Sequence, residues 1–472
     1  MVSKESIKKV LSENYPLMGI LAGITLISIS IGPFQNWDSM IEYQAAMGVI
    51  KWGMPYVNTF GAIINQPPLG FFVEALFFRI FGSSIDGGTM LMTLFGLGST
   101  VLVYLIGKEL YGKTVGLVAA ALFALTPWEL ILSRSFLIDA LYLVPSLVCL
   151  YVGILAVNKN SIKHALISGV FFAVAFLTKD YAVFILIPLL LYYVYSKPKN
   201  LKHILSQLTV FILPAPLCSF LWYQVILGQN LTYIFHSVDF SFPNDPGVVP
   251  TYTFVATFLW NYGLGYCLVV AVTFSLLVYF LFRKEFPKIY IFDLICLGTI
   301  VPIVIVNMVL GVTLNLKSPY NNAIKYDYLT LPFFCLIAAS TVGKCRILFN
   351  STKVKTTLKK PLISAVIIAS AILLVATVII DFASAYFLSL SDYLLFEMRM
   401  GQQVGYSLFN YTPISQNSFL FNIQYAGYAV LLSGLLWLSR HKLNNFFNEL
   451  SKPKHRWIEE KSSSYPQEKD NF

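Results

Sequence analysis

Two acidic residues, Asp38 and Glu42, stand near the start of the first long polar interruption in an otherwise apolar chain. Asp38 directly follows Trp37 and comes just after an apolar run, so we expect its carboxylate to be partly desolvated. Such a carboxylate can act as a general base that takes a proton from a hydroxyl group. The alternative role, compatible with the first, is capping of a helix predicted from Ser39 to Trp52. Glu42, one helical turn later, is either a partner of Asp38 or a solvated residue.

Residues suited to binding a phosphate recur further along the chain, at the ends of apolar runs. Arg134 and Asp139 flank the start of one such run, and Arg134 could clamp a phosphate with two hydrogen bonds, or form a structural salt bridge with that carboxylate. Lys179 and Lys325 are compact cations close to the predicted bilayer surface. They could hold a phosphate carried on a lipid, or serve as membrane anchors.

The polar stretch that holds Asp38 also contains a turn and a double proline. Tyr56 ends the turn Gly-Met-Pro-Tyr, and Gln66 immediately precedes the two prolines. Consecutive prolines fix φ and keep the residue before each of them out of the α region. This rigid segment could aim Gln66 at a substrate, or could simply start the following helix. Glu42, Gln66 and Tyr56 are therefore candidate supporting residues.

Composition indicates the scaffold that must position these side chains. The 472-residue chain is 57% hydrophobic and 12% charged, against about 25% charged residues in soluble domains. This predicts an all-α polytopic membrane protein, since about 20 apolar residues cross a bilayer as a helix. Runs of that order occupy twelve segments, the first of which we expect to be a retained signal anchor: 16–34, 88–107, 114–132, 137–157, 164–179, 181–196, 204–227, 253–282, 289–313, 327–343, 361–381 and 423–439.

The distribution of Lys and Arg orients these spans. With both termini cytoplasmic, most of the 33 basic residues fall on the cytoplasmic side, as the positive-inside rule requires. A further apolar run, 69–82, is short and contains Glu74 and Arg79. Counting this run as a span would invert the charge distribution after it. We therefore predict a re-entrant or interfacial helix there, on the external face and adjoining the first loop.

The predicted organisation is one transmembrane domain, residues 1–440, followed by a polar cytoplasmic tail at 441–472. The first external loop, 35–87, holds Asp38, and the alternation of spans brings Arg134, Asp139 and Lys179 to the same face. The protein is thus expected in a plasma-membrane or endoplasmic-reticulum-type membrane, in contact with its lipids, with the candidate site external or luminal.

Other classes of chemistry have little support in the sequence. There is no Walker A, H-E-x-x-H or G-x-S-x-G motif. Of the five histidines only His236 is predicted to be external, so they assemble no metal cluster. The six cysteines lie in or beside apolar runs without C-x-x-C spacing, as packing residues do. The net charge of +10 resides mainly in cytoplasmic segments, and we expect no nucleic-acid partner.

Several short motifs resemble, in order, the dolichyl-phosphate-mannose–protein mannosyltransferase and aminoarabinose transferase group of the C-type glycosyltransferases. The resemblance covers roughly residues 15–196, with a looser echo at Lys325 to Pro332. The motifs are Trp37-Asp38-(x)3-Glu42, Gly53-Met54-Pro55-Tyr56, Gln66-Pro67-Pro68-Leu69, Phe81-Gly82, Gly107-Lys108-Glu109-Leu110-Tyr111-Gly112, Arg134-(x)4-Asp139 and Leu177-Thr178-Lys179.

The resemblance implies an enzyme that moves a sugar from a polyprenyl phosphate to an acceptor hydroxyl, with inversion. Carried over by position, Asp38 is the general base and Asp139 a second acidic site residue. Arg134, Lys179 and Lys325 are candidates for holding the departing lipid phosphate. No cofactor is obligatory in this reading, although a divalent metal is left open, and the acceptor could be a protein, a lipid or a glycan.

Two positions depart from the family pattern. The family commonly has adjacent acids in the first loop, whereas Asp38 is followed by Ser39. The family often has Lys or His before the double proline, whereas this chain has Gln66, which removes a cation and leaves room for a different donor or acceptor. The alternative function is a transporter or flippase for a lipid-linked substrate, which would use the same cations but need no base.

Overall fold

The computed structural model describes residues 17–23, 37–64, 66–126, 129, 132–196, 201–222, 289–313 and 328–350. These residues are mostly helical, in agreement with the expected fold class. The predicted number of twelve spans stays a prediction, because three of the runs, most of the first, the tail at 441–472 and Lys325 lie outside the described residues.

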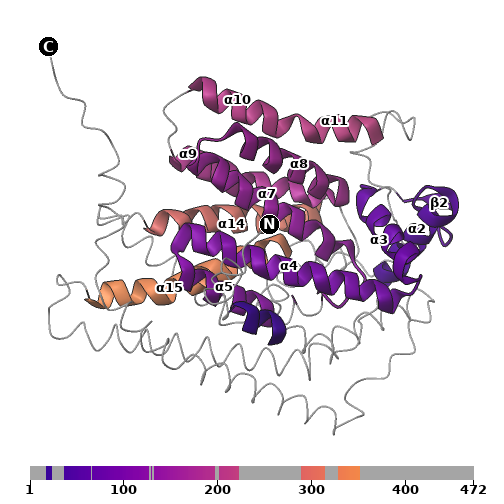
Figure 1. The fold of residues 1–472 in the computed structure, drawn as a ribbon, viewed down its shortest axis with the longest axis horizontal. Coiled ribbons are helices and arrows are strands. Elements are labelled where there is room, and N and C mark those ends of the chain that lie inside the picture. Colours follow the sequence, from indigo (N-terminus) through magenta and orange to yellow (C-terminus); the bar gives the residue numbers. More distant parts are fainter. Residues whose placement is uncertain are drawn as a thin grey trace, which may run out of the picture.

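Four helices run back and forth and form the centre of the bundle: α4 (Ile85–Tyr111), α5 (Lys113–Leu125), α7 (Ile138–Asn158) and α8 (Ile162–Thr178). In Figure 1, α4 and α7 lie side by side along the long axis of the molecule. Within the described residues, Gly87–Tyr111 and Ile138–Asn158 are long and apolar enough to cross a membrane, and several shorter helices are equally apolar. This agrees with a polytopic membrane protein.

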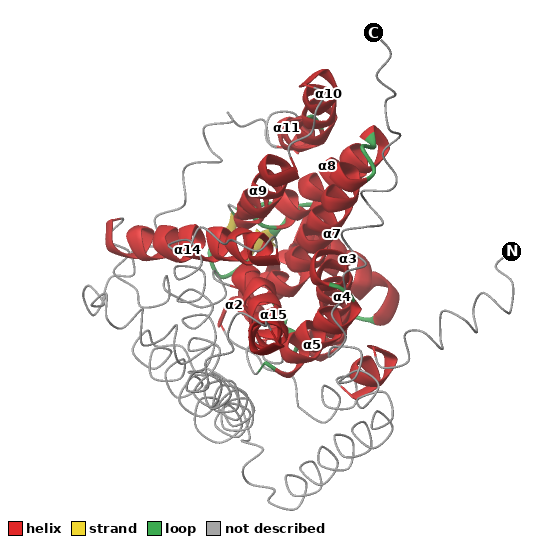
Figure 2. Ribbon diagram, turned by 90° about the vertical axis from the view of Figure 1, so that its left-hand side faces the viewer, coloured by secondary structure: helices red, strands yellow, loops and turns green. Residues whose placement is uncertain are grey.

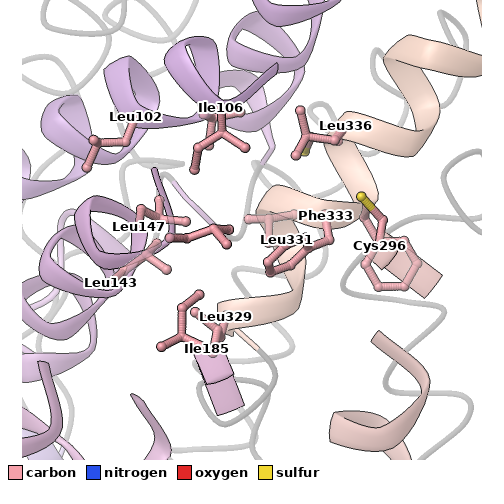
Figure 3. Packing of buried hydrophobic residues seen from close by; sticks show 14 of the residues in the cluster. Leu102, Ile106, Leu143, Leu147, Ile185, Cys296, Leu329, Leu331, Phe333 and Leu336 are labelled. Atoms are coloured by element: carbon pink, nitrogen blue, oxygen red, sulfur yellow. The ribbon is translucent and has the colours of Figure 1, made fainter. Parts of the chain in front are cut away.

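The remaining helices cover this centre. They are the 3-10 helix η1 (Asp180–Ile185), α9 (Leu186–Ser196), α10 (Leu201–Ile212), α11 (Pro214–Phe220), α14 (Ile289–Thr313) and α15 (Leu331–Asn350). Helices α10 and α11 lie at the outer edge, against α8 (Figures 1 and 2). The main core joins α4 and α7 to α14 and α15: Figure 3 shows Leu102 and Ile106 facing Leu336, with Leu143 and Leu147 opposite Leu331.

The first polar stretch forms a small unit with its own hydrophobic core. It contains α2 (Trp37–Trp52), a hairpin of two short strands, β1 (Tyr56–Val57) and β2 (Ala62–Ile63), and α3 (Leu69–Phe81). The strands are antiparallel, with Tyr56 opposite Ile63. Figure 1 shows this unit grouped at one end of the long helices. Its core includes residues from the beginning of α4 and from the segment that enters α7.

Helix α3 lies across the ends of the long helices. A Cβ atom added at Gly70 would lie 2.8 Å from Ile138, the first residue of α7, and 3.3 Å from Thr178, the last residue of α8. Near the other end of α3, Phe78 stacks on Phe136. Both ends of α3 thus contact residues at the same end of the bundle. This geometry supports the placement of 69–82 beside the first loop; which side of the membrane it faces stays a prediction.

Two predicted boundaries were wrong. The run 114–132 is not one continuous helix: α5 ends at Leu125, because Thr126 precedes a proline and adopts an extended backbone, and helical residues recur at Glu129 and Leu132. The run 204–227 is interrupted between Ile212 and Pro214, where the proline lacks the N–H of a helical hydrogen bond. The first break matters for function, since Arg134 then lies in a turn just after the helical residue Leu132 and before α7.

Candidate active site

Asp38 lies in the first turn of α2, which begins at Trp37 rather than at Ser39. The capping interpretation placed Asp38 before the helix, so it is replaced by a position inside the first turn. A carboxylate there is stabilised by the positive end of the helix dipole. The side chain is half-buried, which leaves Asp38 partly accessible, as a general base requires.

Glu42 is buried and binds the start of α7. Its Oε2 atom accepts a hydrogen bond from the backbone N–H of Ile138 at 2.8 Å. This N–H is at the first turn of α7, where backbone donors lack partners within the helix. Of the two roles considered for Glu42, the solvated one is therefore wrong. The contact brings the second turn of α2 to the first turn of α7, so that Asp38 and Asp139 are each close in sequence to one of its two partners.

Asp139 and Lys179 form a buried ion pair, with Lys179 Nζ 2.6 Å from Asp139 Oδ1. Lys179 follows the last residue of α8 and also lies over the ring of Tyr142, 5.7 Å from its centroid. The second oxygen of Asp139, Oδ2, is buried and has no hydrogen-bond partner among the described residues. It is an unused acceptor at the junction of α7 and α8.

Arg134 is buried in the irregular segment before α7, and its Nη1 atom donates to Thr93 Oγ1 at 3.1 Å. Thr93 in turn donates to the carbonyl of Ser133 at 3.0 Å. The carboxylate of Asp139 pairs with Lys179, so the structural salt bridge considered for Arg134 and Asp139 is formed with a different cation. Arg134 instead ties the irregular segment to α4.

Gln66 and Tyr56 hold more peripheral positions. Gln66 is exposed, and Pro68 occupies the capping position of α3, which fits the interpretation of the double proline as a helix start. Tyr56 packs edge-on against Trp52, with ring centroids 4.9 Å apart. The hairpin is pressed against α2, since a Cβ atom at Gly48 would lie 2.4 Å from the carbonyl oxygen of Tyr56. Tyr56 thus shapes the loop.

The structure adds two carboxyl groups that the sequence did not select. Glu74 of α3 is fully buried, and neither of its carboxyl oxygens has a hydrogen-bond partner among the described residues. Glu129 is also buried and accepts a hydrogen bond from the hydroxyl of Tyr328, which lies within electrostatic range of Asp139. The available signal was an ionisable residue inside an apolar run, which is costly unless it has a role.

Lys325 lies outside the described residues, and Tyr328 is the first described residue after it. The bond to Glu129 fixes the entry to α15 three residues after Lys325. The described side chains include no group of three or more His, Cys, Asp or Glu placed to hold one metal ion. The site therefore consists of a half-buried acid on α2, a buried acid–lysine pair, and a nearby arginine, all at one end of apolar helices.

The family match covers part of this site: it includes Arg134, Asp139 and Lys179 but not Asp38 of α2. Residues 65–223 match the family profile described as dolichyl-phosphate-mannose-protein mannosyltransferase. The chain is 25% identical over 194 residues to a Bacillus subtilis (strain 168) protein named "Putative mannosyltransferase YkcB", covering 39% of this chain and 27% of that protein. It is 26% identical over 225 residues to an uncharacterized protein of Aquifex aeolicus (strain VF5), covering 45% and 51%. The matches thus span about half or less of these relatives.

Two solved structures share the fold. The chain superimposes on ArnT from Cupriavidus metallidurans in the apo state with a TM-score of 0.51 at 12% identity, covering 81% of this chain and 74% of ArnT. On ArnT bound to undecaprenyl phosphate the TM-score is 0.54, again at 12% identity, covering 82% and 73%. At this identity the likeness concerns the fold. Together, the comparisons support the resemblance to the C-type glycosyltransferases.

Proposed function

We propose that this chain, which resembles the C-type glycosyltransferases, is an integral-membrane enzyme that moves a sugar from a polyprenyl-phosphate donor to an acceptor hydroxyl. The observation that carries the proposal is the buried Lys179–Asp139 pair beside the acid-bearing helix α2, at one end of membrane-length helices. A lipid-borne substrate needs its phosphate held at the end of such helices, where the charged group leaves the apolar phase. The undecaprenyl phosphate bound by ArnT supports this class of donor.

Asp38 acts in this proposal as the general base for the acceptor hydroxyl. A half-buried carboxylate in a first helical turn is both accessible and held in place. Attack by the deprotonated oxygen on the side opposite the phosphate would invert the configuration at the sugar carbon. Proton removal by a positioned base contributes about 10²- to 10⁴-fold to a rate.

Lys179 and Arg134 stabilise the departing phosphate, with Lys325 as a third cation. The positive charge of Lys179 is balanced by Asp139 in the structure, so a phosphate would share the lysine with that carboxylate. The unused Oδ2 of Asp139 can then accept a hydrogen bond from a sugar hydroxyl. Charge developing on the phosphate would be stabilised by groups already fixed in position.

The direct test is Asp38→Asn, assayed for sugar transfer in membranes supplied with a lipid-phosphate sugar. We expect transfer to fall by about 10²-fold or more, because an amide cannot accept the proton. Asp180→Asn is the matched control: Asp180 is exposed at the same end of the bundle and accepts a hydrogen bond from the N–H of Tyr181. Full transfer by Asp38→Asn would contradict the proposal. Loss of transfer with intact lipid translocation would show that Asp38 serves the transfer chemistry, which a flippase without transferase chemistry does not explain.

We also propose that the site faces outward and that transfer needs no bound metal. Cysteines introduced near Gln66 and near Gly87 should both react with an impermeant reagent from outside, because α3 crosses the bundle end between them. Reaction of the first alone would place α3 through the membrane.

The proposal that transfer needs no bound metal is tested with a chelator of divalent ions. Transfer that survives the chelator would support it, and transfer restored only by added metal would contradict it. The acceptor class, protein, lipid or glycan, is tested by supplying each.

A further inference from the structure

Glu74 is the one described acid that combines full burial with two unpartnered carboxyl oxygens. It lies in the middle of α3, among apolar neighbours that include Phe71, Ala75 and Phe78. A buried carboxylate without a hydrogen-bond donor or a cation is strongly disfavoured. Burial, and secondarily the negative charge of Glu42, raise the pKa of Glu74 well above its ordinary value. Burial therefore favours the neutral, protonated form of Glu74.

The face of α3 that carries Glu74 points to the junction with α7. Gly70 is one helical turn before Glu74 on the same face, and Ile138 packs directly on it. The N–H of Ile138 is bound by Glu42. Glu42 of α2 thus binds the first residue of α7, and α3 packs on the same residue through Gly70, one turn before Glu74. Helices α2 and α3 contact each other in the first-loop core.

The two carboxyl groups differ in what stabilises their charge. Glu42 accepts an N–H bond at the positive end of α7, which favours its ionised form. Glu74 has no such donor among the described groups. Two neighbouring carboxyls in one buried site do not both ionise, so the proton belongs on Glu74. A protonated carboxyl has one O–H donor, and an ionised one has several acceptor positions.

We propose that Glu74 is a positioning residue: as an uncharged acid it donates a hydrogen bond to Glu42 and thereby fixes the carboxylate that holds α2 against the first turn of α7. The pair would lock the helix that carries Asp38 to the helix that carries Asp139. This role deepens the proposed function and rests on it for its catalytic meaning.

The other charged groups around α3 do not replace Glu42 in this role. On α7 and α8, Asp139 and Lys179 are bound to each other. On α3 itself, Arg79 is exposed in the last turn, one turn or more beyond Glu74. Glu42, on α2, is the charged side chain whose field acts on Glu74.

Three variants of the full-length protein in lipid nanodiscs test the inference without an activity assay. Infrared spectroscopy at neutral pH should show a protonated carboxyl band that is absent from Glu74→Gln and retained in the control Glu109→Gln, an exposed acid at the far end of α4. Hydrogen exchange of the Ile138 amide should be about tenfold faster in Glu74→Leu, which lacks the donor, and near wild type in Glu74→Gln, whose amide still donates.

An unchanged carboxyl band in Glu74→Gln, or equal Ile138 exchange in the Gln and Leu variants, would overturn the inference. Sugar transfer supplies a separate reading. If the proposed function holds, Glu74→Leu should lose about tenfold in rate and Glu74→Gln should restore most of it. If wild type itself transfers no sugar while the infrared and exchange results are as expected, the function fails and the positioning role of Glu74 stands.

Discussion

The two ends of the helix bundle differ in the partners that their acidic side chains bind. At the end away from the first loop, Asp293 Oδ1 accepts hydrogen bonds from Tyr111 at 2.9 Å and from Ser340 at 3.0 Å. Glu109 there accepts a bond from Asn158 at 2.7 Å. These acids are bound by neutral donors that join α4 to α7, α14 and α15, which is the pattern of a structural staple.

At the end beside the first loop, the acids face a different set of partners. Asp139 binds a lysine through one oxygen and leaves the other without a partner among the described residues. Neither carboxyl oxygen of Glu74 has a hydrogen-bond partner among the described residues. Glu42 accepts a hydrogen bond from a backbone N–H. Buried polar atoms without partners are costly, and native proteins keep them where a role requires it. Among the acids compared, the contrast therefore distinguishes the candidate site from the far end.

Asp139→Asn should give the largest effect. Removing the charge leaves Lys179 as a buried cation without its counter-ion, which we expect to lower the free energy of unfolding by about 3 kcal/mol. Denaturation of the purified protein in detergent measures this. The double variant Asp139→Asn with Lys179→Met should regain most of the stability yet transfer no sugar. A double variant that still transfers sugar would show that the ion pair has a structural role only, like the hydrogen bonds of Asp293.

Gly70→Ala should come next. The added Cβ atom would lie 2.8 Å from Ile138 Cγ2, so α3 must shift from α7, at a cost of about 1–3 kcal/mol. Transfer activity should fall with it, since the first-loop unit moves relative to Asp139. Gly98→Ala is the matched control on α4, where the nearest atom would be Val144 Cγ2 at 3.4 Å. Equal losses in both variants would argue against a special role for the α3–α7 contact.

The pH dependence of stability should depend on Glu74. Its pKa is raised in the folded protein, so its contribution to stability is fully present below the ordinary pKa of 4.5 and is lost as pH rises toward the folded value. Glu74→Gln should remove this loss, and its melting temperature should exceed that of wild type progressively more as pH increases. A difference in melting temperature between the two proteins that stays the same at all pH values would show that ionisation of Glu74 does not affect the stability.

Glu109→Gln, at the far end, should have the smallest effect. The side chain is exposed, and a glutamine can still accept the bond from Asn158, so we expect less than about 1 kcal/mol in stability and unchanged transfer. Its purpose is to calibrate the far end of the comparison. A loss of transfer as large as that of Asp139→Asn would mean that the two ends do not differ in function.

Much of this architecture could be predicted from the sequence. The apolar runs located α7 and α14 to within a residue or so, because a membrane helix is recognised by composition over its whole length. The charge distribution placed Asp38, Arg134, Asp139 and Lys179 at one end, since consecutive spans must alternate in direction. The helix break after Leu125 was missed, because the apolar run continues past the point where α5 ends before a proline.

The sequence by itself determined the class of protein, its helices, and which ionisable residues share an end of the bundle. Only the tertiary structure decided the partners: Lys179 rather than Arg134 for Asp139, the Ile138 amide for Glu42, and burial without a donor for Glu74. The composition of a span and the alternating direction of consecutive spans follow from the sequence of each segment alone. A hydrogen bond depends on distances of about 3 Å, here between residues 40 and 96 positions apart, and helix packing alone sets them.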